Sequence, residues 1–191
     1  MKKLLSLILV AVLAAALVGA YMLVFAAHTR VLFSPDGKTL LRYPRWGARE
    51  YAIPDGVTAI GDEAFGRCEN LTAVTIPESV TSIGNGAFMF CKNLTSVAIP
   101  NSVTSIGDEA FLGCESLTAV TIPESVTHIG SEAFLGCERL TVVTIPDSVT
   151  KIGNYAFAYC DNLTEVSLPK NLEIDESVFK GCPKAKITRR P

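Results

Sequence analysis

Histidine is scarce in this chain, and the residue patterns of several kinds of active site are missing. His28 and His128 are the two histidines. The sequence contains no Ser-His-Asp set, paired-carboxylate motif, glycine-rich phosphate loop or metal-binding helix. His128 occupies a variable position of a repeat, which favours simple exposure. We therefore predict that the protein is not an enzyme and that it has no catalytic, metal or cofactor-binding residues.

Basic residues are also scarce in the central part of the chain. Residues 53–182 carry 17 acidic and 6 basic side chains, whereas residues 28–52 carry five basic and two acidic ones. Residues 183–191 form a basic C-terminal tail with four positive charges. A protein that binds the phosphate backbone needs a basic face, so the acidic body excludes a nucleic-acid partner. It allows a basic partner or a merely soluble surface.

Charge is absent from residues 4–27, which follow Lys2 and Lys3. A short basic stretch before an apolar run is typical of a secretory signal, and small residues near Ala20 and Ala26 offer cleavage sites. About 20 apolar residues can also span a bilayer as a helix. Residues 1–27 are therefore predicted to be a signal peptide or an N-terminal membrane anchor, with a buried helix as a third reading. Both of the first two place the protein outside the cell or on its surface, and any membrane contact runs through an uncleaved segment.

A repeat of 23 residues extends over residues 53–182. An Ile-Pro or Leu-Pro pair recurs at positions 53, 76, 99, 122, 145 and 168. Phenylalanine and cysteine recur with it, as Phe65, Phe88, Phe111, Phe134, Phe157 and Phe179, and as Cys68, Cys91, Cys114, Cys137, Cys160 and Cys182. The last interval is 22, so the final unit lacks one residue near Glu173. A single unit cannot bury its apolar residues alone, which predicts a stack of about six repeats.

Each repeat contains the elements of one turn of such a stack. Residues 117–122 have the apolar spacing of a short strand, which Pro123 ends because proline has no amide hydrogen to donate. Gly107 is expected to turn the chain with positive φ. Residues 108–114 are expected to form a short helical or 3₁₀ turn that brings phenylalanine and cysteine into the core.

The recurring segments Leu-Thr-x-Val-x-Ile-Pro, Ser-Val-Thr-x-Ile-Gly and Ala-Phe-x-x-Cys resemble the BspA-like leucine-rich repeat of bacterial surface proteins. The similarity covers residues 53–182. It implies a leucine-rich-repeat solenoid with short parallel strands stacked on one face, and with second short strands and helical or 3₁₀ turns elsewhere. It also implies a general role in adhesion or protein recognition, without catalytic residues.

The segment before the first repeat, residues 28–52, is predicted to be a cap. Ser34-Pro35-Asp36-Gly37 and Pro44-Arg45-Trp46-Gly47 are turn signals around a strand-like stretch, which together indicate a β-hairpin. The exposed end of a solenoid must be covered. Trp46 is therefore expected to cover the core, and the alternative is an aromatic that binds a ligand.

Six cysteines in an exported protein suggest disulfides, but the regular period argues against them. Equivalent positions of stacked coils lie about 4.8 Å apart with parallel side chains, which suits disulfide geometry poorly. We predict a buried ladder of free thiols beside the phenylalanine ladder.

Acidic side chains also recur in columns, which include Asp62, Asp108 and Glu115. They are interpreted as a solvated face, and the sharper alternative is a weak surface for Ca²⁺ or a basic ligand, although no calcium loop is present.

The predicted strand face is rich in threonine and nearly uncharged. We predict that a partner binds there, at Thr72, Thr75, Thr95, Ser96, Thr118, Thr121, Thr141, Thr144, Thr164 and Glu165. Threonine also suits strands for its own sake. The face lacks the aromatic and arginine anchors of strong interfaces, which favours weak or multivalent contact with a protein or a glycan. A structural spacer or matrix component without a ligand is the alternative, and a threonine array that binds ice or a mineral is a further one.

Overall fold

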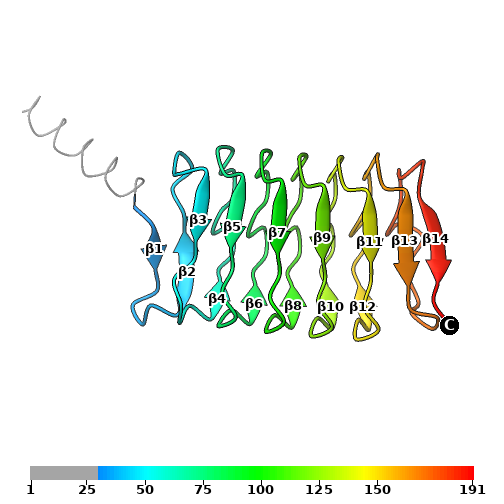
Figure 1. Ribbon diagram of the computed structural model, residues 1–191, viewed down its shortest axis with the longest axis horizontal. Coiled ribbons are helices and arrows are strands. Elements are labelled where there is room, and N and C mark those ends of the chain that lie inside the picture. The colour runs from blue at the N-terminus through cyan, green and yellow to red at the C-terminus, as the bar shows by residue number, and fades with distance from the viewer. Residues whose placement is uncertain (1–29) are drawn as a thin grey trace, which may run out of the picture. The chain divides into compact units, whose positions relative to one another are not determined.

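The structure, a computed structural model, describes residues 30–191, so the predicted apolar segment 1–27 and His28 lie outside the described residues. Residues 31–191 wind into a solenoid in which one 23-residue repeat makes one coil (Figure 1). Strands of successive coils pair in parallel and in register, as Val97 with Val120 and Ile106 with Ile129. The predicted leucine-rich-repeat solenoid is confirmed.

The strands form two layers, one from each of the two short strands of a repeat. The first layer, called the strand face below, consists of β3 (Glu50–Ala52), β5 (Ala73–Thr75), β7 (Ser96–Ala98), β9 (Ala119–Thr121), β11 (Val142–Thr144), β13 (Glu165–Leu168) and β14 (Lys186–Arg189). It divides into one sheet from β3 to β9 and one from β11 to β14. The second layer is a single sheet of β1 (Leu32–Phe33), β2 (Thr39–Arg42), β4 (Ala59–Ile60), β6 (Ser82–Ile83), β8 (Ser105–Ile106), β10 (His128–Ile129) and β12 (Lys151–Ile152).

The repeated prolines end the strands of the first layer and start the turn toward the second. Val120 and Ile122 point into the core, where each keeps less than a tenth of its surface exposed. The carbonyl of Pro123 then accepts a hydrogen bond from the N–H of Val126 (3.0 Å), which closes a β-turn. Val126 is fully buried and leads into β10.

The predicted helical turns are replaced by a chain of β-turns, and no helix occurs within residues 30–191. The N–H of Met89 donates to the carbonyl of Gly86 in its own coil (2.9 Å), as in a 3₁₀ turn. The neighbouring N–H of Phe88 donates instead to the carbonyl of Ala110 in the next coil (2.7 Å). Left-handed φ angles of 57° at Gly86 and Phe90 interrupt the helical path. Some N–H groups of this segment therefore bond within their own coil and others bond to the next coil. In a helix, all of them would have bonded within the segment.

The expectation that Gly107 turns the chain with a positive φ is wrong. Gly107 is not among the residues with positive φ. A Cβ atom added to it would lie 2.7 Å from the carbonyl carbon of Gly84 in the preceding coil. Glycine is needed here because two coils approach too closely for any side chain.

A column of stacked aromatic rings runs through the core. The rings from Phe65 to Phe157 are fully buried, with adjacent centroids 4.9 to 5.0 Å apart and planes within 7° of parallel. Phe179 ends the column at 5.5 Å and is only partly buried. Tyr43 begins it, 5.2 Å from Phe65 and 5% exposed. Each ring stacks on the next, so the same aromatic contact recurs between successive coils.

The N-terminal cap is a β-hairpin, as predicted, but its covering residue is not the one expected. β1 pairs antiparallel with β2, and β2 pairs in parallel with β4, so the hairpin leads directly into the solenoid. Trp46 is 82% exposed, which overturns the expectation that it covers the core. Tyr43 takes that place because it lies 22 residues before Phe65, close to the repeat period, and its ring continues the aromatic column.

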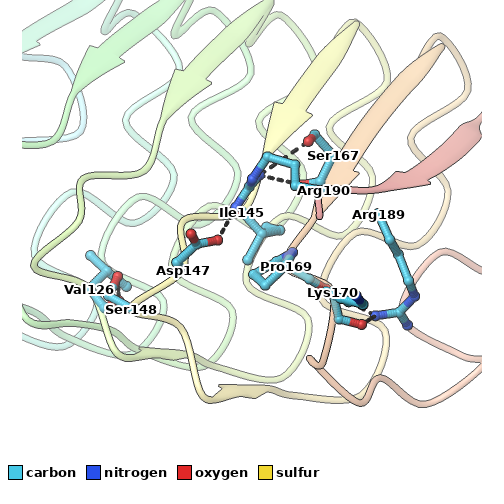
Figure 2. A network of polar contacts seen from close by, with 9 residues as sticks. All are labelled: Val126, Ile145, Asp147, Ser148, Ser167, Pro169, Lys170, Arg189 and Arg190. Carbon is cyan, nitrogen blue, oxygen red and sulfur yellow. Dashed lines mark hydrogen bonds and ion pairs between the residues drawn. The ribbon is translucent and has the colours of Figure 1, made fainter.

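The basic segment 183–191 contributes the last strand. β14 pairs in parallel with β13, and no strand lies between Leu168 and Lys186, where the final unit is one residue short. Figure 2 shows Arg190 reaching back over two coils, with its guanidinium donating to the carbonyl of Ile145 (2.7 Å) and to Asp147 (2.6 Å). Arg189 donates to three carbonyls of the loop 169–172 at 2.7 to 3.1 Å. These arginines donate to main-chain carbonyls of the last coils and tie the C-terminal segment to them.

Truncation of Arg190 tests whether this contact holds the end of the solenoid. Arg190→Ala should lower the free energy of unfolding by about 1 to 2 kcal/mol, because several charge-assisted hydrogen bonds are lost at a partly exposed site. Amide hydrogen exchange in β13 and β14 should accelerate. Lys170→Ala is the control, since its ammonium group makes no hydrogen bond or ion pair within residues 30–191. Equal stability of the two variants would contradict the assignment.

The aromatic column predicts a dependence of stability on position. Phe111→Ala should cost about 3 to 5 kcal/mol, because it leaves a cavity between two stacked rings. Phe179→Ala should cost clearly less, since its ring is partly exposed and has one stacked neighbour. Chemical denaturation monitored by circular dichroism measures both, and a similar loss in the two variants would refute a cooperative column.

Candidate functional site

The strand face is built by alternation along its short strands. The central residue of each strand points into the core, as Val97, Val120 and Val143 do. The residues on either side point outward and are mostly exposed. Because the strands are in register, these outward positions form straight columns across the coils.

Five of the predicted threonines form one column, and their hydroxyl hydrogens are already engaged in hydrogen bonds within the protein. Its members are Thr72, Thr95, Thr118, Thr141 and Thr164. Each hydroxyl donates to the main-chain carbonyl of the equivalent residue in the preceding coil, at 3.0 to 3.4 Å. A hydroxyl has one hydrogen, so these threonines can only accept hydrogen bonds from a partner.

The hydroxyls of a second column of predicted residues can both donate and accept hydrogen bonds. Thr75, Thr121 and Thr144 are exposed, and their hydroxyls make no hydrogen bond within residues 30–191. Ala98 interrupts the column, and the Ser167 hydroxyl at its far end accepts a hydrogen bond from Arg190 (3.1 Å). The sequence could not separate the two threonine columns by their hydrogen bonding, because threonine recurs in both at the same period.

Between these columns the face carries small and apolar side chains. Ala73, Ser96, Ala119 and Val142 occupy the intervening position, and Val142 is 44% exposed. Charge enters only toward the ends, with Glu50 at one and with Glu165 and Lys186 at the other. The structure therefore brings all ten predicted residues onto one face, whose centre is neutral.

The predicted phenylalanine and cysteine ladders lie side by side in the core. Five of the cysteines are buried, Cys182 is partly buried, and all six are free. From Cys91 onward each thiol donates to the carbonyl of a phenylalanine in the preceding coil, at 3.0 to 3.4 Å. Burial raises the pKa of the Cys68 and Cys114 thiols to about 12, which keeps them protonated.

Part of the acidic surface has a structural role that the sequence did not reveal. The Asp62 carboxylate accepts the N–H of Asn85 (2.7 Å), the Asn85 side chain accepts the N–H of Asp108 (2.9 Å), and Asp108 accepts the N–H of Ser131 (2.7 Å). An oxygen-bearing residue at the same position of each repeat was the available signal. Among residues 30–191 no group of three potential ligands is placed to hold a metal ion.

The remaining candidates lie apart from the strand face. His128 is exposed on the second layer, where its ring contacts the hydroxyl of Thr127 (2.8 Å). Trp46 projects from the cap. Within the described part of the chain, no helix has the length and apolar character needed to cross a membrane.

Known proteins share both the repeat and the solenoid. The family model for the BspA type leucine rich repeat region matches residues 47–102 and 81–189, in six copies. A comparison with curated proteins gives no match. The crystal structure of the T. pallidum leucine rich repeat protein TpLRR is 32% identical, with a TM-score of 0.76 over 85% of this chain and 79% of that one.

Two further solved structures extend the comparison. A leucine-rich repeat protein from Bacteroides ovatus is 35% identical, with a TM-score of 0.73 over 83% of this chain and 45% of that one. The pneumococcal vaccine antigen PcpA shares the fold at 23% identity and a TM-score of 0.74, over 84% of this chain and 41% of that one. The chain thus spans less than half of these two proteins. On the repeats, the solenoid and the family match together, the chain belongs to the BspA-type leucine-rich-repeat family.

Proposed function

We propose that this chain is an exported binding module that contacts a protein or glycan partner through its strand face. The observation that carries the proposal is the set of exposed hydroxyls at Thr75, Thr121 and Thr144, which have no hydrogen-bond partner within residues 30–191. They lie on the strand face, whose central strands carry no charged residue. Leucine-rich-repeat families often serve protein binding, which fits this role.

The chemistry of the face defines the partner. One threonine column can only accept hydrogen bonds, while the other can donate and accept. The small side chains between them allow close approach of a flat or extended surface. Without aromatic or arginine anchors in its centre, the face gains little from any one contact. An extended peptide or a glycan chain that spans several coils, bound weakly or multivalently, suits these features.

Lysine substitution on the second threonine column tests the proposal. Thr121→Lys with Thr144→Lys should weaken binding by about tenfold or more, because two long charged side chains disrupt a neutral contact surface. Binding is measured on arrays of host proteins and glycans, followed by calorimetry with each hit. The folded state should persist, since exposed substitutions shift stability by about 0.5 kcal/mol or less.

Thr127→Lys with Thr150→Lys is the matched control, because these exposed threonines lie next to the second layer. Equal loss of binding in both double variants, or no loss in either, would refute binding by the strand face. An array without any hit would favour the alternative role as a structural spacer or matrix component.

The N-terminal sequence supports export. Mass spectrometry of the protein from its own cells should find a chain that begins near Tyr21 or Ala27, if a signal peptide is removed. It should find an intact Met1 in the membrane fraction, if residues 4–27 stay as an anchor. An intact Met1 in the soluble cytosolic fraction would contradict export.

A further inference from the structure

Trp46 lies away from the core in a turn that hydrogen bonds close. The N–H of Gly47 donates to the carbonyl of Pro44 (2.9 Å), which closes the turn. The Tyr43 hydroxyl donates to the carbonyl of Ala48 (3.3 Å), and Gly47 lies so close to the Tyr43 ring that a Cβ atom would approach it to 2.4 Å. The loop is thus fixed to a buried ring while Trp46 remains 82% exposed.

Two arginines flank this tryptophan. Arg45 and Arg49 are exposed, and neither guanidinium makes a hydrogen bond or an ion pair within residues 30–191. The whole cap, residues 28–52, has five basic and two acidic side chains, against 6 and 17 in the repeats. Trp46 therefore projects from the part of the protein whose charge is opposite to that of the body.

The cap also concentrates exposed apolar side chains. Leu32 and Leu41, which are 47% and 41% exposed, lie on the two strands of its hairpin. Together with Trp46 they make up half of the large exposed hydrophobic residues that the structure describes. Tryptophan beside arginine is the composition that proteins place at the headgroup level of a bilayer.

The chain that precedes the cap points to the same partner. The uncharged residues 4–27 end only three residues before Arg30, where the described chain starts. A membrane that holds this segment leaves the cap as the nearest folded part of the protein. We propose that the cap docks on a bilayer of anionic phospholipid, with Trp46 at the headgroup level and with Arg45 and Arg49 at the lipid phosphates.

The C-terminal end is basic as well but lacks this arrangement. The guanidinium groups of Arg189 and Arg190 are occupied by carbonyls and by Asp147. Ile187, 48% exposed, is the large apolar side chain that projects from the last strand. Lys170 and Lys186 at this end therefore offer matched charge changes far along the chain from the cap.

Trp46 is the one tryptophan of the chain, so its fluorescence reports on the cap alone. The full chain is reconstituted into vesicles of phosphatidylcholine, with or without phosphatidylglycerol. In the anionic vesicles we expect a blue-shifted emission, protection from aqueous acrylamide and quenching by brominated lipid. Raising the salt concentration should reverse these changes, because it screens arginine from phosphate. Trp46→Phe supplies the spectral blank.

Arg45→Gln with Arg49→Gln should lower the ratio of docked to free cap by about tenfold or more in anionic vesicles. Lys170→Gln with Lys186→Gln should leave it unchanged. Equal acrylamide quenching in both kinds of vesicle would overturn the proposal, and so would an equal effect of the two double variants. The test is separate from partner binding, since the strand-face lysine variants keep the cap intact and should dock normally.

Discussion

Stacking of identical coils in register is the constraint on which the rest of this structure depends. Hydrogen bonds join successive coils at the strands and also at the turns, where the N–H of Phe88 donates to the carbonyl of Ala110. Each coil must therefore repeat the path of its neighbour closely. The phenylalanine rings then lie about 5 Å apart, and Gly107 touches the main chain of the coil before it. A core residue fits this fold if copies of its side chain can stack about 5 Å apart.

The same constraint decides which polar side chains are available for binding. Short side chains with a hydrogen to donate reach the carbonyl of the preceding coil, as Thr118, Ser125 and Cys114 do. Asp62 and Asp108 instead accept N–H groups of the following coil. These columns stabilise the stack and lose much of their capacity to bind. The hydroxyls of Thr121 and Thr144 keep both their donor and their acceptor capacity, because they make no hydrogen bond within residues 30–191.

The two ends escape the constraint, because each has only one neighbouring coil. At the N-terminal end Tyr43 covers the aromatic column, and this leaves Trp46 and its arginines free to face outward. At the C-terminal end, Arg189 and Arg190 donate to main-chain carbonyls of the last coils. The side-chain arrangements that do not repeat therefore lie at the two ends, whereas the repeats between them share one face with a neutral centre.

The sequence by itself determined the period, the solenoid, the hairpin cap and the columns that share a face, since a 23-residue repeat requires equivalent residues to stack. It could not determine the hydrogen-bond partners within a column. The hydroxyls of one threonine column donate to carbonyls of the preceding coil and those of the other do not, and Gly107 is explained only by a neighbouring main chain. Likewise, the choice of Tyr43 over Trp46 as the covering residue depends on which ring meets Phe65 after folding. Such distances arise between residues about 22 positions apart, so tertiary packing alone decided them.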